Sequence, residues 1–257
     1  MPIDLLVHIY RRQLYTQRPA AALLQAVTAY CWYTHRQQER TWAALDGQPS
    51  LVILLSDTTV TFSGACHFVV RDAFFCNGAL QQTYIHLQPG TRLLIIRFTA
   101  DGLSRLQARN GTKLLTAAKE VWEALPVAAL RQLRNKREQA RLLDHFLEEQ
   151  LQKDVMGNYL LQAAVQQVYA AKGNISVAAL CSINRVNYKW LERNFRQQLG
   201  ITPKLYIDNI RFLHAYLDMA LEQQSLTGIA LNNGYYDQNH FIKACKRYTG
   251  CIPSTIR

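Results

Sequence analysis

Residues 225–248 read SLTGIALNNGYYDQNHFIKACKRY, and this stretch decides the fold of the C-terminal part of the chain. Apolar residues at helical spacing lie on both sides of Gly234, which lacks a side chain and so permits the positive φ of a tight turn. Asp237 is placed to cap a second helix by accepting a hydrogen bond from an exposed backbone N–H. In that helix Phe241 and Cys245 are expected to face inward. The stretch therefore predicts a helix-turn-helix unit.

A second unit is predicted upstream, at residues 176–198. Ser176 and Asn187 are placed to cap its two helices, while Leu191 and Phe195, four residues apart, form a buried stripe. Short loops connect all helices after residue 158, as helix-turn-helix units require. The predicted helices are 159–171, 176–182, 187–198, 203–219, 226–232, 237–248 and 253–256.

The second helix of each unit, at about 187–198 and 237–248, has an outer face that suits the major groove of DNA. Amides can pair with adenine, and Arg or Lys can reach guanine or phosphate. Glu192 has two interpretations, because it could accept a hydrogen bond from cytosine or repel phosphate. The candidate DNA-binding residues are Lys189, Glu192, Arg193, Arg196, Gln238, Asn239, Ile242, Lys243 and Lys246.

These residues make residues 159–257 resemble the AraC/XylS family of bacterial transcription regulators. The matching stretches are GYYDQNHF at 234–241, KRYTGCIPS at 246–254 with Arg257, and LGITP at 199–203. The resemblance implies two helix-turn-helix units joined by a long helix at about Pro203–Met219. It also implies double-stranded DNA and RNA polymerase as partners.

Four positions depart from the family pattern. Arg185 stands where the first unit often has Gly, and Cys245 stands where the second usually has a large aromatic residue. Ile252 replaces the usual Ser before Pro253, and Gly228 replaces a commoner polar residue. The first unit is the weaker match to the family.

Residues 1–112 are expected to be mostly β after an initial helix at Ala20–Tyr33. Turn formers separate short β-branched or aromatic runs, which predicts a sandwich or open barrel. The chain is thus predicted to be a two-domain α+β protein. The expected strands are Leu51–Leu55, Thr59–Phe62, Cys66–Val70, Thr83–Leu87 and Arg92–Phe98.

This part resembles, more faintly, a domain that precedes the DNA-binding module in a subgroup of such regulators. The similarity lies in Tyr30-Cys31-Trp32, in Asp46-Gly47 and in Pro89-Gly90. It implies a sensory or dimerisation domain and names no ligand. An effector site is therefore left unknown. Aromatic residues and one cation could line a pocket, although the core is the commoner place for them: Trp42, Phe62, Phe74, Phe75, Tyr84, Arg97 and Phe98.

Residues 113–157 are expected to form a helical linker or dimerisation region. Apolar positions recur at helical spacing in 113–124 and 137–153, and a linker is expected at Asp154–Asn158. The stripe of Leu143, Leu147 and Leu151 has two interpretations: it closes the core of its own domain, or it meets a second subunit in a homodimer. The DNA-binding domain then covers 158–257.

The 257-residue chain carries 29 Lys+Arg against 18 Asp+Glu, a formal net charge of +11, which suits a polyanionic partner. No carboxylate pair, nucleophile elbow or phosphate-binding loop appears, so no enzyme, metal or cofactor is predicted. Six widely spaced cysteines indicate buried, reduced thiols. No apolar run reaches the ~20 residues that span a bilayer, so a cytoplasmic protein is expected. The alternative function is an architectural DNA-binding protein that needs no effector.

Overall fold

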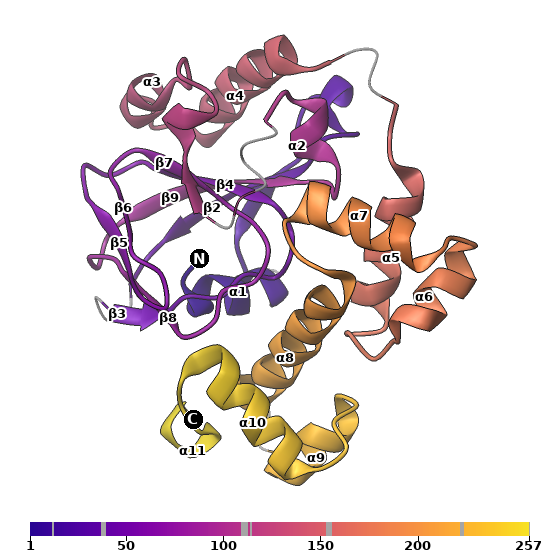
Figure 1. Cartoon of the computed structure of the whole chain (residues 1–257). Helices are drawn as coiled ribbons and strands as arrows, with labels where there is room; N and C mark the ends of the chain where they lie inside the picture. Colours follow the sequence, from indigo (N-terminus) through magenta and orange to yellow (C-terminus); the bar gives the residue numbers. More distant parts are fainter. Residues whose placement is uncertain are drawn as a thin grey trace.

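The computed structural model describes residues 1–11, 13–36, 40–108, 113, 115–152, 156–221 and 224–256. A β-rich N-terminal part, coloured indigo to magenta, stands beside a helical C-terminal part (Figure 1). Two antiparallel sheets form the first part, with strand orders β1-β2-β9-β4-β7-β10 and β3-β8-β5-β6. The strands are β1 (Tyr15–Gln17), β2 (Val27–Thr34), β3 (Arg40–Trp42), β4 (Ser50–Leu54), β5 (Val60–Gly64), β6 (Phe68–Val70), β7 (Ala73–Cys76), β8 (Thr83–His86), β9 (Arg92–Phe98) and β10 (Leu115–Ala117).

The predicted α+β, two-part fold is confirmed, and all five expected strands are present. The helix expected at Ala20–Tyr33 is wrong, because a short 3₁₀ helix η1 (Ala21–Leu23) leads into β2 there. Strand β2 pairs with both β1 and β9. Its residues 30–33 are all buried, so both faces of the strand are covered and its apolar run imitates a helical pattern. The first helix is instead α1 (Ile3–Tyr10).

The helix expected at 113–124 is also wrong. Residues 115–117 form the edge strand β10, in which Leu115 lies opposite Cys76 of β7, and the 3₁₀ helix η3 (Ala118–Glu120) follows. Pairing with a sheet edge decides the backbone here, and apolar spacing alone does not reveal such a partner. A four-residue helix, α2 (Gly102–Arg105), lies between β9 and β10.

Helices α3 (Val127–Gln132) and α4 (Lys136–Gln150) cover one face of the six-stranded sheet (Figure 1). Leu143 and Leu147 are fully buried in a core with Trp122 and the sheet, and Leu151 packs against its edge. The stripe therefore closes the core of its own domain. The interpretation that it meets a second subunit is wrong, since these side chains are not available to a partner.

The C-terminal helices confirm the prediction element by element. They are α5 (Tyr159–Ala170), α6 (Val177–Asn184), α7 (Tyr188–Leu199), α8 (Pro203–Leu221), α9 (Leu226–Asn232), α10 (Gln238–Thr249) and α11 (Pro253–Ile256). Asn158 caps α5 by accepting a hydrogen bond from the Leu161 amide at 3.1 Å. Of the expected linker at Asp154–Asn158, residues 154 and 155 lie outside the described residues.

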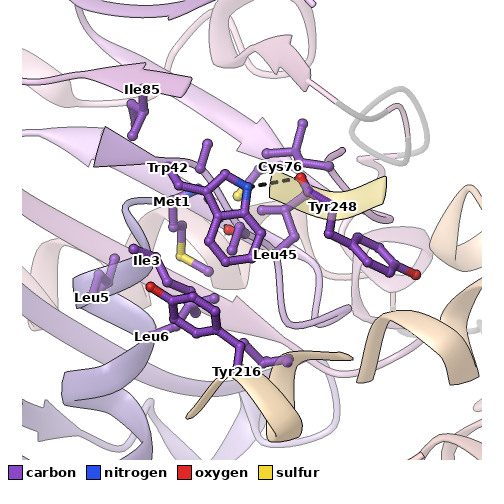
Figure 2. Close-up of a cluster of buried hydrophobic side chains, with 14 of the residues drawn as sticks. Met1, Ile3, Leu5, Leu6, Trp42, Leu45, Cys76, Ile85, Tyr216 and Tyr248 are labelled. Carbon is purple, nitrogen blue, oxygen red and sulfur yellow. Dashed lines mark hydrogen bonds between the residues drawn. The ribbon is translucent and has the colours of Figure 1, made fainter. Parts of the chain in front are cut away.

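Three hydrophobic cores hold the chain together. One lies between the six-stranded sheet and α3–α4, and another lies inside the first helix-turn-helix unit. The third joins the interior between the two sheets, α1 and the second unit. Figure 2 shows this third core, where Met1, Ile3 and Leu6 lie near Trp42 and Tyr216.

All six cysteines are free thiols, as predicted. The expected burial holds for Cys31, Cys76 and Cys245, whereas Cys66, Cys181 and Cys251 are half-buried. Burial raises the pKa of the Cys76 thiol to about 11 and that of Cys245 to about 12, so both stay protonated near neutral pH. Within the described ranges, none of the helices combines the length and the apolar character that crossing a membrane requires.

Replacing Leu147 with Ala should lower the free energy of unfolding by about 2–5 kcal/mol, because the change leaves a cavity in a closed core. Urea denaturation followed by circular dichroism measures this. The exposed neighbour Glu148 is the matched control, and its change to Ala should stay within about 0.5 kcal/mol. A folded Leu147→Ala protein as stable as the parent would contradict this placement of the stripe.

Candidate nucleic-acid interface

The first helix-turn-helix unit consists of α6 and α7. The Ser176 side chain accepts from the Ala179 amide at 3.0 Å, and Asn187 accepts from the Trp190 amide at 2.8 Å. Both caps satisfy backbone donors that a helix start leaves open. Between the helices Arg185 adopts a left-handed conformation, with φ +52°. The departure from Gly therefore places a strained non-glycine residue in the turn.

The second unit, α9 and α10, repeats these features. The Ser225 side chain accepts from the Gly228 amide at 3.1 Å, and Asp237 accepts from the His240 amide at 2.7 Å. Gly234 occupies the turn with φ +70°, as predicted. A Cβ at this position would lie 2.5 Å from the Asn174 side-chain oxygen, so any other residue would also force the Asn174 side chain to move.

The two units are an internal repeat of about 25 residues. Buried Asn184 and Asn233 occupy equivalent places, and each donates its side-chain N–H to the carbonyl four residues earlier, at 2.8 and 3.0 Å. The second helix of each unit, α7 or α10, is called its recognition helix below. Each ends in a left-handed glycine, Gly200 or Gly250. The second unit has one additional turn residue, Tyr236. The repeat gives each recognition helix the same buried side and the same outward side.

On α7 the four candidate residues share the outward side. Lys189, Arg193 and Arg196 are exposed, and Glu192 is half-buried. Arg196 forms an ion pair with Glu192 at 3.1 Å, so the acid is partly neutralised within the helix. The neighbouring Trp190 is half-buried and packs on the core of the unit. The cations of α7 are therefore presented to solvent with only one acid among them.

On α10 Asn239, Lys243 and Lys246 are exposed, whereas Gln238 and Ile242 are half-buried. The Thr227 hydroxyl lies 3.0 Å from the side-chain oxygen of Gln238 and donates to it. This hydrogen bond holds the Gln238 amide at the start of α10 and leaves its NH₂ group available to donate to another group. Such an amide can pair with adenine, which needs one donor and one acceptor.

Two exposed aromatic residues at the same end of the recognition helices were not among the sequence-derived candidates. Tyr188 is 49% exposed at the first position of α7, equivalent to Gln238 in α10. Tyr236 is 87% exposed in the turn before α10. The signal that could have found Tyr188 is the alignment of the two units, which places it at a candidate position of the other helix.

Most of the residues that could have lined an effector pocket lie in the core, which is the commoner of the two places considered for them. Trp42, Phe62, Phe74, Phe75 and Phe98 are buried among other apolar side chains. The Arg97 guanidinium is buried and paired with the Asp46 carboxylate, and Tyr84 lies under the guanidinium of Arg40. In the part of the chain that the structure describes, no group of three or more His, Cys, Asp or Glu could hold a metal ion.

A family model described as a helix-turn-helix domain matches residues 180–257, which includes α7, α8 and the whole second unit. The C-terminal region is an AraC-type helix-turn-helix module. Arg257, the last residue of the matched stretch, lies outside the described residues.

Curated relatives share this AraC-type module. "HTH-type transcriptional activator RhaS" of Escherichia coli is 29% identical over 111 residues, which is 43% of this chain and 39% of that protein. An uncharacterised HTH-type transcriptional regulator of Haemophilus influenzae is 33% identical over 81 residues, 32% of this chain and 26% of that protein. The chain thus spans well under half the length of the curated relatives it matches.

The whole fold has solved counterparts. ToxT from Vibrio cholerae O395 superimposes with a TM-score of 0.51 at 14% identity, covering 88% of this chain and 95% of that chain. The same protein in another crystal form gives a TM-score of 0.53. At this identity the likeness is one of fold, and it extends across both the β-rich part and the AraC-type module.

Replacing Arg185 with Gly should raise the free energy of unfolding by up to ~1 kcal/mol. A left-handed non-glycine residue costs about 1–2 kcal/mol, and glycine returns part of this through the greater entropy of the unfolded chain. Thermal denaturation measures the shift. Arg193→Gly is the matched control, because it places glycine inside α7 and should cost about 1 kcal/mol. Equal losses from both changes would show that the turn is not strained.

Proposed function

We propose that the protein is a sequence-specific transcriptional regulator of the AraC type, which binds double-stranded DNA with α7 and α10 in successive major grooves. The observation that carries this proposal is the repeated outward face, which has cations on both recognition helices and amides beside them on α10, above a buried side. Amides beside cations favour base contacts, since a binder that only follows the backbone needs positive charge alone. This supports a regulator over the architectural alternative.

For the rest of the chain we propose a sensory domain at residues 1–112, a helical region at 113–157 and the DNA-binding domain at 158–257. ToxT has been solved with an organic acid bound. A cavity of about 290 Å³ lies where the β-rich part meets α5 and α8, lined by Gln48, Tyr169 and Tyr206 among others, and is our candidate effector site. The proposal also includes binding to RNA polymerase, formation of a homodimer and a cytoplasmic location. No enzymatic activity is part of it.

The proposal predicts a steep dependence of DNA affinity on salt. Each phosphate neutralised by Lys or Arg should contribute about −0.9 to the slope of log K against log salt concentration. Fluorescence anisotropy on a selected duplex between low and moderate salt measures the slope. A flat dependence would refute DNA binding through these faces.

Arg193→Ala and Gln238→Ala should each lower affinity for the preferred site by about 1–3 kcal/mol and relax preference at one base position. Competition binding against a panel of single-base variants separates base contacts from phosphate contacts, which would weaken all sequences alike. The matched controls are Arg137→Ala and Gln132→Ala. They remove an exposed cation of α4 and an exposed amide of α3, away from both recognition helices.

A further inference from the structure

Both recognition helices end against the same rim of the β-rich part. The connection between β7 and β8, residues 77–82, reaches α7 at one end and α10 at the other. The Asn77 side chain donates to the Gln198 carbonyl at 3.3 Å. The Gln82 backbone amide donates to the Tyr248 carbonyl at 2.6 Å, and its side chain donates to the Lys246 carbonyl at 3.3 Å.

The contacted carbonyls are equivalent in the internal repeat. Gln198 and Tyr248 each lie two residues before the left-handed glycine that ends their helix. The last four carbonyls of a helix have no partner within it, so an external donor is needed to satisfy them. One six-residue connection supplies such a donor to the same carbonyl in both helices.

The connection between β7 and β8 is also fixed by contacts within the β-rich part. Leu80, between the two contact residues, is buried in the core that the sheets share with the second unit. The Gln82 carbonyl accepts from the Ala65 amide at 3.0 Å, and Gln82 keeps a left-handed conformation with φ +45°. A non-glycine residue stays in this region only where its surroundings hold it.

We propose that Asn77 and Gln82 are positioning residues that fix the spacing and orientation of the two recognition helices, and with it the DNA spacing that the protein accepts. The inference rests on the proposed function and deepens it. Helix α8 links the two units directly, and it also packs against Trp42 of the β-rich part through Phe212 and Tyr216. The contacts of Asn77 and Gln82, called the rim contacts below, hold the C-terminal end of each recognition helix against the β-rich part. The β-rich part can then alter DNA selection without touching DNA.

The test uses the full-length protein and a duplex obtained by in vitro selection. Affinity is measured on this duplex and on duplexes with one base pair inserted or deleted between the two contacted segments. One base pair shifts the second segment by about 3.4 Å and roughly a tenth of a turn. The parent protein should discriminate strongly against the altered spacings. The double variant Asn77→Ala/Gln82→Ala removes both side-chain contacts and keeps the bond from the Gln82 backbone amide to Tyr248. The loss of the two side-chain hydrogen bonds should reduce that discrimination by about two- to tenfold.

Gln81→Ala is the matched control, because Gln81 lies in the same connection and, within the described residues, its side chain makes no hydrogen bond. Partial unfolding of a variant lowers the active fraction on every duplex alike, so the ratio between spacings reports positioning and not stability. A spacing profile of the double variant identical to that of the parent would overturn the inference, as would a parent protein indifferent to spacing. If selection yields no preferred duplex, the proposed function itself fails, which is a distinguishable result.

Discussion

Trp42 is the side chain on which the joining of the two parts depends. Its ring lies edge-on to Phe212 and Tyr216 of α8, with centroids 5.5 and 4.9 Å away, and its Nε1 donates to the Tyr248 carbonyl at 3.1 Å. Figure 2 shows this indole between the sheet interior and Tyr216 and Tyr248 of the helical part. A large ring with one polar atom satisfies both needs of the junction, because it fills apolar space and completes a helix end.

A consequence is that the two units are unequal. The first has a core of its own, in which Phe195 packs edge-on against Tyr206 of α8 at 5.3 Å. The second unit has Cys245 at the place equivalent to Phe195, and Phe212 of α8 stacks on its Tyr248 at 4.5 Å. These residues share their core with the β-rich part. Residues 158–257 taken alone would therefore expose apolar surface mainly at the second unit.

Polar contacts complete the attachment of α5 and α8 to the β-rich part. The Asp101 carboxylate accepts from the Asn158 amide at 2.8 Å and from the Gln162 side chain at 2.6 Å. The Asn209 side chain donates to the Leu45 carbonyl at 2.8 Å, midway along α8. Tyr169 donates to the carbonyl of Asp46. Both units are attached to the β-rich part. A conformational change in that part can therefore be transmitted directly to both recognition helices.

Elements that are determined by neighbouring residues could be predicted from the sequence. Elements that depend on pairing with residues far along the chain could not. Caps, a turn glycine and helical spacing lie within a few residues of each other, so every C-terminal helix and its outward face could be predicted. Strand β2 and strand β10 depend on neighbours far along the chain, and both were mistaken for helices. The rim contacts of Asn77 and Gln82 join residues more than 100 positions apart, and no local pattern marks them.

The charges on the two recognition helices suggest how the units divide the work of recognition. Among the outward candidates of α10 none is acidic, so this helix can approach phosphates without repulsion. On α7 the surface pair of exposed Arg196 with half-buried Glu192 is worth only about 0–1 kcal/mol, because water screens it. Arg196 can therefore turn to a phosphate at small cost, which leaves Glu192 free to accept from a cytosine amino group. If both helices enter the major groove as proposed, the first unit would gain affinity and base preference in the same step, whereas the second unit would read bases with side chains that are already in place.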